Sequence, residues 1–141
     1  MEAILICNTK QAAFQIGEPS EISAARRAGN ELCRALGFDE LRTGQVALVI
    51  TEAATNIVKH AVRGQIILRA IEQDGVRGID ILAIDAGPGM ANVALQMQDG
   101  QSTAGTYGVG LGAIARLSHE FDLVTAAGAG VTVTIRKWKL F

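Results

Sequence analysis

The segment from Asp39 to about Val62 constrains the fold more than any other part of the chain. Its apolar residues recur with the i, i+3, i+4, i+7 spacing of one helix face, at Val46, Val49, Ile50, Ala53, Ile57 and Ala61. Asp39 is a good N-cap residue, and Gly44 weakens the helix near its start. A helix with such a stripe must bury it against a second layer of structure.

The residues before this helix predict a strand region and a first helix. Residues 3–16 predict one or two strands with an irregular join. Ser20 is the expected N-cap of a helix that runs to about Leu36, and Glu21 favours the positive end of its dipole. Gly37 is expected to end this helix, because glycine adopts the left-handed conformation found there.

The residues after the long helix predict two hairpins and a short helix. The strands "QIILRAI" and "IDILAID" are joined by the turn "EQDGVRG", and a long loop spans roughly residues 86–107. A short helix then follows the glycines of 108–112 and runs to about Ser118. The strands "FDLVTAA" and "VTVTIRKW" flank the turn "GAG", and the last strand alternates apolar and polar residues. We therefore predict an α+β fold, a two-layer sandwich whose mostly antiparallel sheet carries three helices on one face.

Composition excludes several classes of protein. The 141 residues suit a single domain, residues 1–141, and the 49% of apolar residues indicate a globular chain. A net charge of -1 without a basic cluster argues against a nucleic-acid partner, and no apolar run is long enough for a membrane span. Cys7 and Cys33 lack metal-ligand spacing, so we expect small apolar thiols in a cytoplasmic protein. We expect the tail "RKWK" to be a solvated strand end, with Trp138 half-buried.

Two polar residues interrupt the long helix beside its apolar stripe. Glu52 and Asn56 are four residues apart in "TEAATNIVKH", so both lie on one helix face at the edge of the core. Asparagine offers Mg²⁺ a neutral oxygen ligand, and a glutamate can accept a proton from a hydroxyl group. Without further motifs, the simpler interpretation is that both side chains cover the flank of the helix.

The stretch "IDILAIDAGPGM" places a carboxylate at the end of an apolar strand. Asp85 must be satisfied by a donor in such surroundings, and an exocyclic amine of adenine is a suitable one. Gly87 and Gly89 would let the backbone come close to a flat base. The alternative is an ordinary turn, because D-x-G is common turn chemistry.

The stretch "GTYGVGLGAIARL" places glycines before an apolar helix. Backbone amides at a helix start bind anions, and glycines at 105, 108, 110 and 112 would let phosphates approach them. The spacing differs from that of a Walker A loop, and the position in the chain does not suit a Rossmann fold. The alternative is a flexible hinge.

The three motifs in this order resemble the GHKL ATPases, the family of gyrase B, heat-shock chaperones, histidine kinases and mismatch-repair ATPases. The resemblance covers nearly the whole chain and implies a Bergerat-type ATP-binding fold with ATP and Mg²⁺ as cofactors. It implies that Asn56 ligates Mg²⁺, that Glu52 is the general base, and that Asp85 binds the adenine amine. It further implies nucleotide-binding roles for Gly87, Gly89, Gly108, Val109, Gly110, Leu111, Gly112 and Thr132.

Within that superfamily the chain resembles the small bacterial serine/threonine kinases of partner-switching systems. The stretches "AARRAGNELCRALGF" and "MQDGQSTAGTYGVGLGAIARLSHEF" are closer to the stressosome switch kinases than to the anti-sigma-factor kinases. The resemblance implies a STAS-domain antagonist as the phosphorylated partner, with a sigma factor or a PP2C-type phosphatase as a further candidate partner. It implies no nucleic-acid and no membrane partner.

Two other interpretations remain open at this stage. The chain would be a binding module that holds nucleotide and regulates a sigma factor or phosphatase with little turnover, or a detached catalytic domain of a histidine kinase. Phosphate transfer to a serine of the partner would distinguish a serine/threonine kinase from the binding module. An acid-labile phosphohistidine would indicate the histidine-kinase domain. Lys59 and Arg116 are candidate phosphate contacts, although solvated charges are the simpler interpretation.

Overall fold

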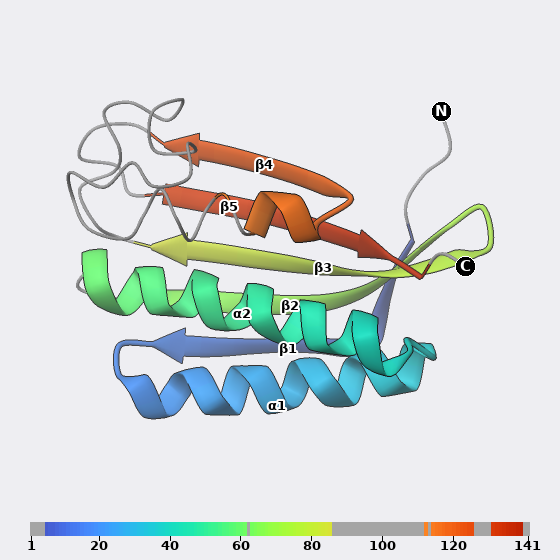
Figure 1. Ribbon diagram of the computed structural model, residues 1–141, viewed down its shortest axis with the longest axis horizontal. Helices are drawn as coiled ribbons and strands as arrows, with labels where there is room; N and C mark the ends of the chain where they lie inside the picture. Colours follow the sequence, from blue (N-terminus) through green and yellow to red (C-terminus); the bar gives the residue numbers. More distant parts are fainter. Residues whose placement is uncertain (1–4, 62, 86–111, 113, 126–130, 140–141) are drawn as a thin grey trace.

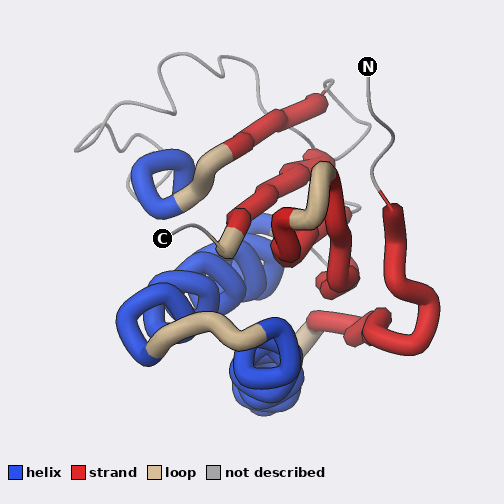
Figure 2. The backbone as a smooth tube through the Cα atoms, turned by 90° about the vertical axis from the view of Figure 1, so that its right-hand side faces the viewer, coloured by secondary structure: helices blue, strands red, loops and turns tan. Residues whose placement is uncertain are grey.

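The computed structural model describes residues 5–61, 63–85, 112, 114–125 and 131–139. Five strands form one antiparallel sheet in the order β1-β2-β3-β5-β4. The helices lie together on one side of this sheet, as the view along the layers shows (Figure 2). The predicted α+β two-layer sandwich is therefore confirmed.

Helix α1 (Pro19–Leu36) begins earlier than predicted. Its N-cap is Glu18, and Pro19 occupies the first turn, where a missing N–H costs nothing; the prediction of Ser20 as N-cap was wrong. The Glu21 carboxylate accepts hydrogen bonds from the N–H groups of Gly17 and Glu18, both at 2.8 Å. The helix ends at Gly37, whose φ of 83° is the left-handed conformation expected there.

Helix α2 (Glu40–His60) runs antiparallel to α1 (Figure 1). The Asp39 side chain caps its start, accepting the N–H of Arg42 at 2.8 Å. The predicted apolar stripe is buried at Val46, Val49, Ile50, Ala53 and Ile57. Ala61 lies just past the helix and is only partly buried, because the chain has already turned toward the sheet.

Strands β2 (Gly64–Gln73) and β3 (Val76–Asp85) form a longer hairpin than predicted. Their ladder extends to the pair Gln73–Val76, so the turn contains only Asp74 and Gly75. These two residues have φ values of 54° and 77°, the type I′ geometry that suits the twist of paired strands. The predicted seven-residue turn was therefore wrong.

The remaining strands agree closely with the predicted pattern. Strand β1 (Leu5–Ile16) pairs with β2, and the predicted irregular join is a register shift between Ile6 and Gln11. Strands β4 (Glu120–Thr125) and β5 (Val131–Trp138) form the other edge of the sheet. The predicted loop over residues 86–107 and the "GAG" turn lie outside the described residues.

The core lies between the helices and the inward side of the sheet. It includes Ile66 and Leu68 from β2, Ile79 and Ile81 from β3, and Ile135 from β5. The short helix, which includes Gly112 and residues 114–117, adds its buried residue Ile114. Cys33 belongs to this core as predicted, and burial raises the pKa of its thiol to about 12. Cys33 is therefore an unreactive apolar residue of the core.

Candidate functional site

The end of α2, the end of β3 and the start of β5 meet at one end of the molecule (Figure 1, left). Gly64 is the contact point between the first two. A Cβ atom built on Gly64 would lie 2.4 Å from the carbonyl oxygen of Ile84, and 3.0 Å from both Asp85 Cα and Ile57 Cγ2. The absence of a side chain at Gly64 therefore lets the last turns of α2 come close to the end of β3.

The helix contributes Asn56 and Glu52 to this end. Asn56 is 6% exposed, and its carboxamide makes no hydrogen bond to any part of the chain that the structure describes. Asn56 is not among the described residues that have a fully buried polar atom without a partner, so its carboxamide at the edge of the core can offer its oxygen to a ligand that is not part of the chain. Glu52 is half-buried one turn earlier on the same side of the helix.

The sheet contributes Asp85 and Thr132. Asp85 is the last residue of β3, is half-buried and already makes a polar interaction. Thr132 is half-buried near the start of β5 and pairs with Ile84, so its side chain is on the side of the sheet that carries Asp80 and Arg136, opposite to the helices. The structure thus brings Asp85 and Thr132 to adjacent strands, although they are 47 positions apart in the printed sequence.

The glycine-rich motifs are only partly covered by the structure. Gly112 is described, and it is a buried residue at the start of the short helix. The other predicted nucleotide-binding residues lie outside the described residues: Gly87, Gly89, Gly108, Val109, Gly110 and Leu111. Their roles remain predictions. Lys59 and Arg116 are both exposed, and the functional role considered for each is not tested.

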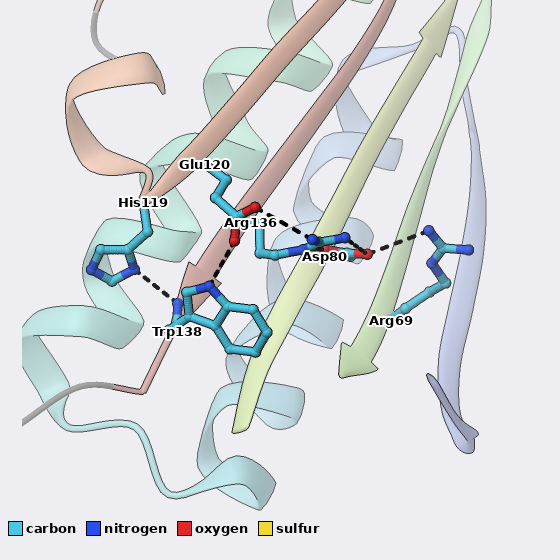
Figure 3. A network of polar contacts seen from close by, with 6 residues as sticks. All are labelled: Arg69, Asp80, His119, Glu120, Arg136 and Trp138. Carbon is cyan, nitrogen blue, oxygen red and sulfur yellow. Dashed lines mark hydrogen bonds and ion pairs between the residues drawn. The ribbon is translucent and has the colours of Figure 1, made fainter. Parts of the chain in front are cut away.

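A network of charges that sequence analysis missed lies on the other side of the sheet (Figure 3). Asp80, only 1% exposed, receives two hydrogen bonds from the Arg136 guanidinium, from Nε at 2.6 Å and Nη2 at 3.1 Å. Arg69 Nη2 lies 3.4 Å from the same carboxylate. The hydrogen bond to Asp80 raises the pKa of Arg136 above its usual value. These contacts tie β2, β3 and β5 together in the middle of the sheet.

Two further residues extend this network to the edge strand. Glu120 on β4 lies 3.4 Å from Arg136 Nη1 and accepts the indole N–H of Trp138 at 2.8 Å. The Arg136 guanidinium lies 5.9 Å from the Trp138 ring centroid, within reach of a cation–π interaction. One signal in the sequence points to this network: Arg69, Asp80 and Arg136 stand in apolar strands, with opposite signs on neighbouring strands.

The tail "RKWK" is not the solvated strand end that was predicted. Lys137 is 6% exposed, and its ammonium donates a hydrogen bond to the Leu117 carbonyl oxygen at 2.6 Å. Burial lowers the pKa of Lys137, with the charge of Arg42 adding to the effect. Leu117 is at the C-terminal end of the short helix, where a cation is favoured. Lys137 therefore anchors that helix, while Trp138 is half-buried as predicted.

His119 gives the fold a dependence on pH. Its Nδ1 accepts the backbone N–H of Trp138 at 2.9 Å, which requires an unprotonated nitrogen. Burial lowers the pKa of His119, as do the charges of Lys137 and Arg42, while Glu120 raises it. The unfolded chain therefore binds the proton more tightly, so this contribution to stability is present above the ordinary pKa of about 6.5 and is lost as the pH falls below it.

We expect a His119→Asn variant, which keeps an acceptor but cannot titrate there, to lose this dependence. Urea unfolding at pH 7.5 and pH 5 would measure it. The free energy of unfolding of the wild type should fall more between the two pH values than that of the variant. Equal decreases in the two proteins would contradict the assignment.

The described side chains include no cluster of three or more His, Cys, Asp or Glu residues that could hold a metal ion. Among the helices in the described ranges, none has the length and apolar character needed to cross a membrane.

Comparisons with known proteins identify the family of this chain. Residues 17–137 match the family model described as "Histidine kinase-like ATPase domain". The serine/threonine-protein kinase RsbT of Bacillus subtilis (strain 168) is 36% identical over 128 residues, which cover 91% of this chain and 96% of that protein. A chain from the crystal structure of the SiaB-SiaC complex of Pseudomonas aeruginosa is similar in fold, with a TM-score of 0.57 at 16% identity, over 90% of this chain and 89% of that one.

The chain therefore belongs to the family of histidine kinase-like ATPases. Within that family its relationship to RsbT defines it as an enzyme, a serine/threonine-protein kinase that uses ATP. The resemblance inferred from the three motifs is thus confirmed. The likeness to the SiaB-SiaC structure supports the fold alone.

Proposed function

We propose that this protein is a Mg²⁺- and ATP-dependent kinase that phosphorylates a STAS-domain antagonist in a bacterial partner-switching pathway in the cytoplasm. The observation that carries the proposal is that the last turns of α2, which carry Asn56, pack against the Asp85 end of β3 through Ile57 and Gly64. A carboxylate for adenine, an oxygen ligand for a metal and a proton acceptor are then found at one end of the fold.

The sheet side of the site would hold the base of ATP. The Asp85 carboxylate would accept a hydrogen bond from the exocyclic amine of adenine. The proposed role of Thr132 has no support from the register, which puts its side chain on the other side of the sheet. Gly87 and Gly89 would let the backbone approach the ring. The amides of residues 108–112 would bind the phosphates at the start of the short helix.

The helix side would hold Mg²⁺ together with the phosphates. The buried carboxamide of Asn56 fits this ion because its oxygen is a hard, neutral ligand without a described hydrogen-bond partner. A single amide cannot hold the ion alone, so the phosphate oxygens would supply further ligands. The chemistry that Mg²⁺ would supply there is a positive charge that stabilises the negative charge developing on the phosphates during transfer.

Glu52 would act on the incoming hydroxyl. It would accept the proton of a serine or threonine as the hydroxyl oxygen bonds to the γ-phosphorus and the bond to the β–γ bridging oxygen breaks. The products would be ADP, a phosphorylated side chain and the proton held by Glu52. The remaining contribution of the chain would be positioning, since Asn56 and Glu52 are fixed on one rigid helix.

The likeness to RsbT, a serine/threonine-protein kinase, supports a protein as phosphoacceptor. A STAS-domain antagonist is the partner class implied by the motif resemblance. A sigma factor or a PP2C-type phosphatase is a further candidate for a regulatory contact.

Calorimetric titration of ATP, with and without Mg²⁺, tests the nucleotide site. We expect Asp85→Asn to weaken ATP binding by at least about tenfold, because a charged hydrogen bond is lost. Asn56→Ala should remove most of the Mg²⁺ dependence of the affinity. Asp74→Asn, in the hairpin turn at the other end of β3, is the matched control and should bind as the wild type does. A wild type that binds no ATP would overturn the proposal.

A further inference from the structure

The outward side of α2 carries two exposed leucines. Leu41 is 69% exposed and Leu48 is 45% exposed, and they are the only large apolar side chains that are exposed among the described residues. They are seven residues apart, or about two helical turns, so they lie on the same side of α2. Neither belongs to the described core, so both are available to contact another molecule.

Glu52 lies on the same line along the helix. At about 100° per residue, Leu41, Leu48 and Glu52 fall within roughly 40° of one another around the axis. The exposed Lys59 continues the line beyond Glu52. We call this set of four residues the outer stripe of α2. Asn56, by contrast, is displaced toward the core and is buried.

Gly44 adds an independent observation between the two leucines. It is exposed, its φ is not positive, and a Cβ atom built on it would meet nothing within 4 Å. Neither packing nor backbone conformation therefore requires glycine at this position. Glycine within a helix is unfavourable relative to alanine. The missing side chain leaves an open notch between Leu41 and Leu48.

We propose that the outer stripe of α2, with the notch at Gly44, is the docking surface for the protein phosphoacceptor. An apolar patch of the STAS-domain protein contacts Leu41 and Leu48 while its serine or threonine hydroxyl reaches Glu52. This inference rests on the proposed function. The inference predicts that the acceptor protein has an apolar side chain that fills the notch at Gly44.

The position of Glu52 on the outer stripe is the reason for choosing the phosphoacceptor protein as the molecule that binds there. Leu48 lies about 6 Å and Leu41 about 16 Å from Glu52 along the helix axis. A protein partner of standard size covers about 800 Å² of surface, a disc of roughly 16 Å radius. A protein whose contact area is centred on Glu52 therefore covers Leu48 and Gly44, and it reaches Leu41. A second copy of this chain on the same stripe would instead exclude the acceptor from Glu52.

Phosphorylation kinetics with a purified STAS-domain protein as the probe test the inference. We expect Leu48→Lys and Leu41→Lys each to raise the KM for this protein by at least about tenfold, because a charge replaces a buried apolar contact. The dissociation constant for ATP should stay within about twofold of the wild-type value, measured by calorimetry. Ala35→Lys, an exposed position on α1, introduces the same charge away from the stripe and should leave the KM unchanged.

The outcomes separate this inference from the proposed function. Binding of ATP without phosphorylation of the STAS-domain protein by the wild type would refute the proposed acceptor class, and the inference with it. Phosphorylation with an unchanged KM in both leucine variants would refute the docking surface alone. A wild-type dimer in light scattering that dissociates in Leu48→Lys would assign the stripe to a second copy and would likewise overturn the inference.

Discussion

Replacement of Asp80 by alanine is expected to lower the free energy of unfolding by about 3 kcal/mol, because it leaves the charge of Arg136 without its buried partner. The value lies at the low end for a broken buried ion pair. The side chains of Arg136 and Arg69 are 20% and 26% exposed, so water screens part of the unpaired charge and reduces the loss of stability. Urea unfolding measures the change.

Asp122→Ala is the matched control for this prediction. Asp122 is an exposed carboxylate on the neighbouring strand β4, so its removal should change the stability by less than about 0.5 kcal/mol. The double variant Asp80→Ala/Arg136→Leu should be more stable than the sum of its single changes implies, because it no longer buries an unpaired cation. Similar losses for Asp80→Ala and Asp122→Ala would show that the network does not stabilise the sheet.

Replacement of Glu52 by glutamine is expected to reduce the rate of phosphoryl transfer by at least about a hundredfold, because an amide cannot accept the proton of the incoming hydroxyl. The affinity for ATP should be nearly unchanged, since the proposed contacts to the base and metal come from Asp85 and Asn56. Single-turnover transfer to a STAS-domain protein measures the rate, and calorimetry measures the affinity.

Glu31→Gln supplies a control for the change in charge. Glu31 is an exposed carboxylate on α1, so the variant makes the same replacement away from α2 without altering Glu52. Transfer by this variant should stay close to the wild-type rate. A Glu52→Gln protein that transfers phosphate at the wild-type rate would exclude Glu52 as the general base and leave the acceptor hydroxyl to be activated by another group.

The local pattern predicted the elements that have a regular period. The stripe from Val46 to Ile57 repeats every 3.6 residues, and the strand from Val131 to Trp138 alternates, so both were found with nearly correct ends. The start of α1 was predicted wrongly, because Pro19 suits the first turn and moved the N-cap back to Glu18. The hairpin turn was predicted too long, because the side-chain pattern does not show how far a ladder continues.

The polar centre of the sheet could not be predicted in the same way. Asp80 and Arg136 are 56 residues apart, and only the pairing of β3 with β5 brings them opposite one another. The sequence alone suggests that Lys137 is a surface lysine. Only the fold brings the Leu117 carbonyl of the short helix to its ammonium group. Such contacts depend on register and on the packing of distant elements, which a single sequence does not display.

The sequence by itself determined the class of elements, their order and the residues that have the right chemistry for the nucleotide: the Glu52–Asn56 pair and Asp85. These follow from local periodicity and from residue types at short spacing. Only the tertiary structure decided which of them meet and how deeply they are buried. Gly64 lets α2 approach the end of β3, and the fold buries the Asn56 carboxamide while leaving Leu48 exposed beside Glu52. The physical reason is that burial and proximity arise from packing between distant segments.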